Sequence, residues 1–262
     1  MHDSPTPLLR DFDRQDPRLG RRQQLDARSL PFMVERIPAE LRRPLRSTRW
    51  GRSLRILDQG DLGACVGFAS TGLLGTAPFD CLDEVLGVTA YTDGDLAKRA
   101  HDYAEALYSE CTAKDPYEGA WPPEDTGTDG LTACQVLKAR GVIGAYRHAS
   151  TLRGLVELLQ DGPVLMGMPW HERFFEPDHE GRIDPVGWAD TPEVGGHEVV
   201  IEGVALDAHE PAALDRALLI CANSWSERWG MMGGRFLMGG RTYELLRSSI
   251  DLRQPFGMPT PN

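Results

Sequence analysis

The sequence predicts an α+β fold, with a helical first half and a sheet-rich second half. Between residues 65 and 160, apolar residues recur at three- to four-residue spacing, which is the period of amphipathic helices. After residue 163, short apolar runs are separated by Gly and Pro, a pattern that is typical of strands. Because the helices precede the strands instead of alternating with them, we expect the two kinds of element to form separate lobes.

Four segments of the first half are predicted to be helical: residues 65–74, 95–111, 131–140 and 151–160. The first is rich in small residues, which implies close packing against its neighbours. The second follows Asp95, a candidate N-terminal cap, and its apolar residues keep the helical period. Gly141 ends the third helix, and Ser150 or Thr151 is suited to cap the fourth.

The second half is predicted to form strands at residues 164–168, 199–201, 218–221 and 235–238, followed by a helical turn at residues 242–247. Each strand segment is a short apolar run between turn residues. A Pro-rich loop at residues 116–129 separates the second and third helices. The sequence contains no internal repeat and no low-complexity tract.

At 262 residues and 41% hydrophobic content, the chain is long enough for one sizeable domain, or for two lobes around one cleft. Residues 1–24 are rich in Arg, Asp and Pro and lack an apolar period. We therefore expect an irregular N-terminal arm at residues 1–24 and a single folded domain at residues 25–262. Because the arm has few groups able to bury apolar area, its removal is expected to change stability little.

Charge is unevenly distributed along the chain. The net charge is −11, yet residues 1–55 hold thirteen Arg against seven acidic residues. Such an arm can dock on an acidic partner or on a nucleic acid. We favour a solvated arm that lies on the acidic body of the same chain. Since no phosphate-binding loop or base-stacking pattern is present, no nucleic-acid partner is expected.

The chain is expected to be cytoplasmic. No apolar run approaches the roughly 20 residues that a membrane span needs, and the first residues lack the layout of a secretory signal. The spacing of the five cysteines (Cys65, Cys81, Cys111, Cys134 and Cys221) shows no disulfide framework, which fits a reducing compartment. Association with a virus particle is the alternative location.

Residues 58–70, Asp-Gln-Gly-Asp-Leu-Gly-Ala-Cys-Val-Gly-Phe-Ala-Ser, have the composition of a Gly-rich loop that runs into a helix. Cys65 stands where the helix begins, and the helix dipole there favours the thiolate and lowers the pKa of the thiol. Gln59, six residues upstream, can donate its side-chain amide to a developing oxyanion. A buried structural cysteine is the plainer interpretation of Cys65.

Two later stretches make the catalytic interpretation stronger. Gly195-Gly196-His197 opens an apolar run, and Asn223-Ser224-Trp225 is followed by Trp229-Gly230. These boxes and the Gln-Gly…Cys box occur in the order found in papain-like cysteine peptidases of the C1 family, and the chain resembles that family over about residues 26–255. The Asp-Gln-Gly form of the first box is similar to the compact prokaryotic and bacteriophage branch.

The resemblance implies the papain fold, two lobes with a cleft between them, and thiol-dependent hydrolysis of peptide bonds. It implies that Cys65 is the nucleophile and His197 the general acid and base. Asn223 would orient the imidazole, Trp225 would shield their hydrogen bond from water, and Gln59 would complete the oxyanion hole. The chain departs from the family at Thr128, where a second glycine is usual, and at Ser226, where glycine is usual.

A peptide or protein substrate is the expected partner. By the resemblance, Gly127 and Thr128 would hold the substrate backbone, and the neighbouring pocket would be lined by Gly195, Gly196, Gly167 and Met168. No cofactor is expected, and no metal site either, because His171, Glu172 and His179 lack a fixed ligand spacing. A folded inhibitory prodomain is not expected, since only 58 residues precede Gln59.

Two alternatives to a peptidase stay open. The first is a catalytically idle papain fold that serves as a binding or structural module, for example in a phage particle; the residues around Cys65 and the Arg-rich arm suggest it. The second keeps the chemistry but acts on isopeptide or cell-wall peptide bonds. The complete set of Gln59, Cys65, His197 and Asn223 favours an enzyme over the idle module.

Overall fold

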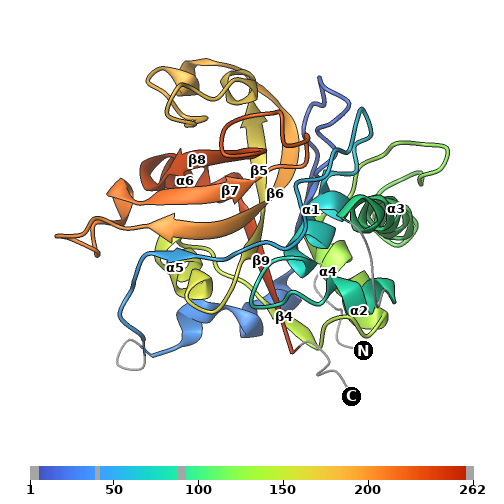
Figure 1. The fold of residues 1–262 in the computed structure, drawn as a ribbon, viewed down its shortest axis with the longest axis horizontal. Helices are drawn as coiled ribbons and strands as arrows, with labels where there is room; N and C mark the ends of the chain where they lie inside the picture. The colour runs from blue at the N-terminus through green and yellow to red at the C-terminus, as the bar shows by residue number, and fades with distance from the viewer. Residues whose placement is uncertain (1–5, 39–41, 88–92, 258–262) are drawn as a thin grey trace.

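A seven-stranded antiparallel sheet and a cluster of helices form two lobes that lie side by side (Figure 1). The computed structural model describes residues 6–38, 42–87 and 93–257. The predicted α+β class and the separation of helices and strands into two lobes are confirmed. Figure 1 shows α1 to α4 on one side of the molecule and strands β5 to β9 on the other.

The helical lobe contains α1 (Cys65–Leu74), α2 (Leu82–Leu86), α3 (Asp93–Thr112) and α4 (Gly130–Ala139). All ten residues of α1 are buried, which explains its small side chains: a Cβ at Gly67 would lie 2.4 Å from the Ala104 carbonyl oxygen of α3. The helix predicted from residue 95 begins at residue 93, so Asp95 lies inside α3 and is not its cap. Asp129 caps α4 through the backbone N–H of Thr132.

The sheet has the strand order β4-β9-β5-β6-β7-β8, and β3 pairs with β6. The strands are β3 (Thr48–Arg49), β4 (Ala145–Arg147), β5 (Val164–His171), β6 (Glu193–Ala205), β7 (Leu218–Ala222), β8 (Arg235–Gly239) and β9 (Asp251–Phe256). The four predicted strands are present, and β5 and β6 are longer than expected. Sequence analysis did not predict β9, whose six residues include two charges and a proline.

Two hydrophobic clusters meet at this sheet. On one face, Met166 of β5 and Val199 of β6 belong to a cluster that also holds residues of α5 (Leu152–Leu159) and α6 (Gly240–Leu246). On the other face, Leu165 and Val200 belong to the core of the helical lobe. The strand alternation therefore assigns one face of β5 and β6 to each lobe. Thr151 caps α5 through the N–H of Gly154, as predicted.

The described part of the N-terminal arm, residues 6–24, is not a solvated tail. It forms a hairpin from β1 (Leu8–Arg10) and β2 (Gln23–Leu25), so β2 crosses the expected boundary at residue 24. Leu19, Gly20 and Arg21 are buried, Leu19 and Arg21 with 1% exposure each. The arm does lie on the acidic body, since Arg14 pairs with Asp125 and Arg10 with Glu193. The expectation of a solvated arm is therefore wrong for its last part, whereas Leu8 and Leu9 are exposed and the effect of removing the arm stays a prediction.

Candidate active site

The loop before α1 places Cys65 at the first turn of a buried helix. Gly60 adopts a φ of +58°, which favours glycine, and Asp58 accepts a hydrogen bond from its N–H at 3.1 Å. Against the larger effect of burial, the backbone of Glu198, the neighbour of His197 in β6, and that of Gly20 in the arm both favour the charged form of the Cys65 thiol and lower its pKa. Cys65 and the start of β6 therefore meet across the two lobes.

His197 lies in β6, Asn223 directly follows the adjacent strand β7, and the two side chains are hydrogen-bonded. The distance between His197 Nε2 and Asn223 Oδ1 is 2.7 Å. The backbone N–H of Ser224 also donates to Asn223 Oδ1, at 2.7 Å. Since a backbone N–H can only donate, this second bond fixes the amide oxygen as the acceptor, so His197 Nε2 carries the proton. His197 Nδ1 is buried and has no partner, which leaves its lone pair free to accept a proton.

Aromatic rings enclose that pair. The ring centroids of Trp225 and Trp170 lie 4.6 and 4.9 Å from that of His197. His197 itself has no exposed surface, and Trp225 is 4% exposed. Ser226, which follows Trp225, has a φ of +64°, and this left-handed conformation explains why glycine suits the position. The arrangement keeps water away from the hydrogen bond between His197 and Asn223.

Gln59 is held by its backbone and by both ends of its side chain. Its N–H donates to the Ser224 carbonyl at 2.9 Å, and its side-chain oxygen accepts from the hydroxyl of Ser224. The side-chain Nε2 donates to the carbonyl oxygens of Leu62, at 2.7 Å, and of Arg18 in the arm, at 3.0 Å. The side-chain amide of Gln59, a predicted oxyanion donor, is therefore already hydrogen-bonded to peptide carbonyls of the same chain, one of them from Arg18 in the arm.

Residues 18–22 of the arm, called the cleft segment below, leave a turn at Arg18 and form isolated bridges to both lobes. Gly20 bridges Gly196 and Arg21 bridges Thr128, both in parallel orientation. Arg21 N–H donates to the Gly196 carbonyl at 3.0 Å, and Gly20 accepts from Thr128 N–H at 2.9 Å. A Cβ at Gly20 would lie 1.8 Å from the carbonyl oxygen of Gly63, so only glycine fits beside the Cys65 loop. Figure 1 shows this part of the chain in dark blue between α1 and β6.

Burial beneath the cleft segment reverses the expected ionisation of the pair. Desolvation raises the pKa of the Cys65 thiol from 9.0 to about 12. It also lowers the pKa of His197 from 6.5 to about 4, which the bond to Asn223 offsets only in part. In this closed form the thiol and the imidazole are both neutral at pH 7. The lowered thiol pKa expected from the helix start is therefore not found while the arm is in place.

Five of the six predicted substrate-binding residues contact the cleft segment or its side chains. Gly196 and Thr128 pair with its backbone. A Cβ would lie 2.2 Å from the Gly20 carbonyl at Gly127, 2.7 Å from Leu19 Cβ at Gly195, and 2.4 Å from Arg21 Nε at Gly167. Met168 is not among them, because strand alternation turns it to the opposite face of β5, where it joins the core of the sheet lobe.

Residues that sequence analysis did not single out complete the site. Glu198 and Asp251 are buried beside Arg21, and Arg21 forms an ion pair with Asp251. Glu198 directly follows the predicted histidine, so it could have been noticed. Asp251 and Arg21 lie near opposite ends of the chain, and no local pattern connects them. All five cysteines are free and buried.

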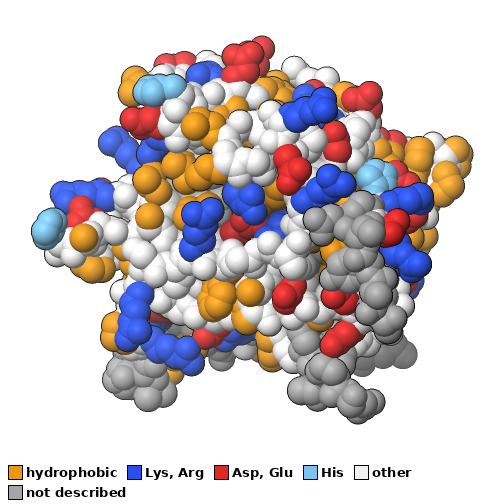
Figure 2. All heavy atoms as spheres, in the orientation of Figure 1, with side chains coloured by type: hydrophobic (Ala, Val, Ile, Leu, Met, Phe, Trp, Pro, Cys, Tyr) orange, Lys and Arg blue, Asp and Glu red, His pale blue; other side chains and the backbone are white. Residues whose placement is uncertain are grey.

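Within the described residues, no group of three or more His, Cys, Asp or Glu side chains is placed to hold a metal ion. No described helix is both long enough and apolar enough to span a membrane. Figure 2 shows acidic and basic side chains interspersed over one face of the molecule, without a large area of one sign.

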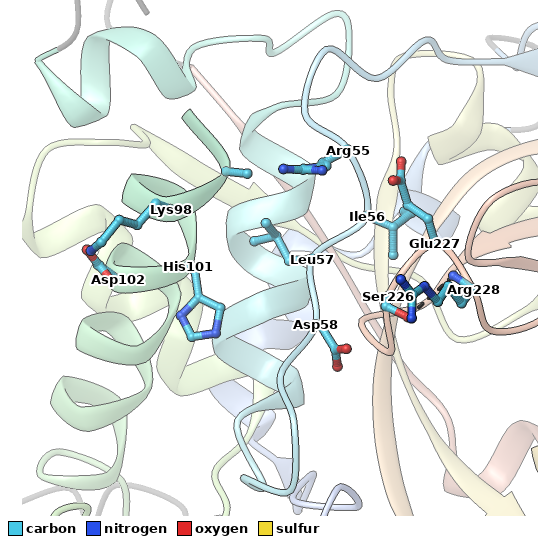
Figure 3. A pocket seen from close by; sticks show the side chains of 11 residues that line it. Arg55, Ile56, Leu57, Asp58, Lys98, His101, Asp102, Ser226, Glu227 and Arg228 are labelled. Atoms are coloured by element: carbon cyan, nitrogen blue, oxygen red, sulfur yellow. Dashed lines mark hydrogen bonds and ion pairs between the residues drawn. The ribbon is translucent and has the colours of Figure 1, made fainter. Parts of the chain in front are cut away.

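A surface cavity of about 590 Å³ lies outside the cleft (Figure 3). It is lined by residues 55–58, by Lys98, His101 and Asp102 of α3, and by residues 226–228. None of Gln59, Cys65, His197 or Asn223 lines this cavity. Its lining contains both acidic and basic side chains.

Solved structures that share this fold include a cysteine protease and two procathepsins. Xylellain, a cysteine protease from Xylella fastidiosa, has a TM-score of 0.65 at 14% identity, covering 97% of this chain and 100% of that chain. Procathepsin B S9 from Trypanosoma congolense has a TM-score of 0.59 at 15% identity, covering 94% of this chain and 88% of that chain. Digestive procathepsin L 3 of Tenebrio molitor larval midgut has a TM-score of 0.52 at 16% identity, covering 83% of this chain and 72% of that chain.

In sequence, no family model matches the chain, and no curated protein matches it. The structural similarity over nearly the whole chain establishes the papain-like fold. At these identities it concerns the fold alone.

Proposed function

We propose that this papain-like chain is a thiol-dependent peptidase, which its own N-terminal arm keeps latent in the state described above. Cys65 is the nucleophile, His197 the general acid and base, and Asn223 the residue that orients the imidazole. Gln59 and the backbone N–H of Cys65 donate to the oxyanion. The observation that carries the proposal is the hydrogen-bonded His197–Asn223 pair, which leaves His197 Nδ1 free on a residue whose neighbour, Glu198, acts through its backbone on Cys65 at the start of α1.

The reaction follows from these positions. Cys65 transfers its proton to His197 Nδ1, and the thiolate attacks the peptide carbonyl carbon. The carbonyl oxygen takes the negative charge and accepts hydrogen bonds from Gln59. His197 then protonates the leaving amine, and the C–N bond breaks to give a thioester on Cys65. His197 next removes a proton from water, which attacks the thioester and releases the acid and the free thiol.

The latent state is supported by the hydrogen bonds of the cleft segment. The Arg18 carbonyl accepts from Gln59, and Gly20 and Arg21 use the backbone groups of Thr128 and Gly196. These are the groups that a bound peptide strand would need. Because the segment belongs to the same chain, its effective concentration is high, on the order of millimolar for a short tether. A folded prodomain is not required for such inhibition.

Asn223→Ala is expected to leave partial activity. The asparagine orients His197 without exchanging a proton, so turnover should fall by less than the roughly 10²- to 10⁴-fold that a general acid and base contributes. A fall of about 10- to 100-fold in kcat, with KM little changed, is the expected result. Full activity in Asn223→Ala would show that the bond to His197 has no catalytic role.

The pH dependence of turnover tests the proposed function. A chain with a displaced arm, such as Gly20→Ala, should show a bell-shaped profile because the thiol and the imidazole titrate as a coupled pair. The acid limb reports formation of the ion pair and the alkaline limb loss of the proton from His197.

Gln59→Ala in the same background is the matched control. It should lower turnover by about 10- to 1000-fold, as for one oxyanion donor, without moving either limb. Peptide hydrolysis that survives complete alkylation of Cys65 would contradict the proposal.

A further inference from the structure

The side chain of Arg21 fills a pocket built from acidic residues on the cleft side of the sheet. Glu198, Gly167 and Asp251 lie in register on β6, β5 and β9, so their side-chain directions share one face. That face is the one turned to the helical lobe, as Leu165 and Val200 show. These three residues, with Asp129 at the start of α4, are called the arginine pocket below.

Gly167 makes room for the guanidinium. A Cβ at this position would lie 2.3 Å from Asp251 Oδ1, 2.4 Å from Arg21 Nε and 2.7 Å from Glu198 Oε2. Arg21 Nε, Asp251 and Glu198 therefore all lie close to the space above Gly167, and the guanidinium donates to Asp251. The side chain of Arg21 has no exposed surface and that of Asp251 is 3% exposed, so the contact is shielded from water.

The arginine pocket contains more acid than its own cations neutralise. Asp129, Glu198 and Asp251 are all buried, and Arg253 of β9 is the buried cation that acts on them besides Arg21. Burial and the charge of Asp251 raise the pKa of Glu198 well above its usual range, whereas Arg21 lowers it. Glu198 Oε2 and Asp251 Oδ2 have no hydrogen-bond partner even with Arg21 in place. An empty pocket would leave these buried carboxyl groups without the guanidinium and favour their protonation, so a bound guanidinium would restore the partner of their charged form.

We propose that this pocket selects substrates by an arginine side chain, which takes the place of Arg21 when a peptide replaces the cleft segment. The inference rests on the proposed peptidase function. Arginine suits the pocket better than lysine, since a planar guanidinium can donate to Asp251 and Glu198 together, whereas an ammonium is a strongly hydrated point charge. The backbone groups of Thr128 and Gly196, which hold Arg21, would position the arginine of the peptide.

The test uses full-length Arg21→Ala, in which the pocket is empty and the arm has lost its buried ion pair. Peptide substrates carry either arginine or citrulline, its uncharged isostere, at each position on both sides of the scissile bond in turn. At one position, kcat/KM for arginine should exceed that for citrulline by at least about 100-fold. Adding Asp251→Asn should reduce that ratio to less than about 10. If Arg21→Ala does not fold, Arg21→Gln replaces it in the same assay, because glutamine keeps a longer polar side chain than alanine.

A binding measurement separates failure of the pocket from failure of the function. N-ethylguanidinium should raise the melting temperature of Arg21→Ala by about 2–4 °C at saturating concentrations, and N-ethylurea should not. Wild-type protein, whose pocket is full, should respond to neither.

Three results are decisive. Equal turnover of arginine and citrulline peptides at every position would overturn the pocket and leave the peptidase standing. If N-ethylguanidinium stabilises Arg21→Ala while no peptide is cleaved, the arginine pocket is supported and the proposed peptidase function fails. If N-ethylguanidinium does not stabilise the variant and no peptide is cleaved, the proposed arginine pocket is overturned.

Discussion

Gly20→Ala is expected to open the cleft and raise peptide turnover by roughly 10²- to 10³-fold. The new Cβ would lie 1.8 Å from the carbonyl oxygen of Gly63 and 2.4 Å from its carbonyl carbon. Both are backbone atoms below a buried helix, so the arm must move instead. Its departure breaks the buried pair between Arg21 and Asp251, a loss that costs about 3–5 kcal/mol when one partner is removed. The clash acts on the closed form alone, so the population with an open cleft grows even though opening loses this pair.

Opening should also change the chemistry of the thiol. If the pKa of Cys65 returns from about 12 to 9.0, the thiolate fraction at pH 7 rises about 1000-fold. The lower basicity of the thiolate reduces its intrinsic reactivity, so alkylation should accelerate by about 30-fold or more.

Gly51→Ala is the matched control, because a Cβ at Gly51 would meet no atom within 4 Å. It should leave turnover and alkylation as in wild type. Equal alkylation rates in wild type, Gly20→Ala and Gly51→Ala would show that the arm does not limit access to Cys65.

Cys65→Ala is expected to abolish peptide turnover in the opened background. Removing the nucleophile of a coupled set costs on the order of 10⁶-fold in rate, because the remaining groups have no thiolate to assist. The fold should be retained, since the change removes one sulfur atom at the start of a helix. Circular dichroism and thermal unfolding of the double variant Gly20→Ala/Cys65→Ala provide that check.

His197→Ala should be nearly as severe as Cys65→Ala, since the two act as a unit. If Gly20→Ala/Cys65→Ala hydrolyses peptides as fast as Gly20→Ala, Cys65 is not the nucleophile. The papain fold would then be better explained as a binding module.

The helices could be predicted closely because their signals are local. Asp129 and Thr151 cap α4 and α5, and both are visible in the sequence as a polar residue before an apolar period. The strand predicted at residues 199–201 is too short, because β6 begins at Glu193 with Glu-Val-Gly-Gly-His-Glu, which is not an apolar run. Those residues serve the site, so their composition does not resemble a strand.

The proposed catalytic set could be selected from the sequence because its members occur in short motifs, whereas the acidic pocket could not. Asp251 and Arg253 are charged residues in β9, which local propensity disfavours. They are stable there because buried partners from residues 21 and 198 surround them. The arm was misjudged for the same reason: arginine is usually solvated, and only the fold supplies the buried carboxylate that pairs with Arg21.

The most direct test of the central claim is mass-spectrometric mapping of a thiol alkylator at limiting dose on Gly20→Ala near neutral pH. The proposed pair predicts that Cys65 is labelled well before Cys81, Cys111, Cys134 and Cys221, and that His197→Ala removes this preference. Wild type should show slow labelling at Cys65. Slow and uniform labelling of all five cysteines in Gly20→Ala would contradict an activated thiol and favour the idle binding module.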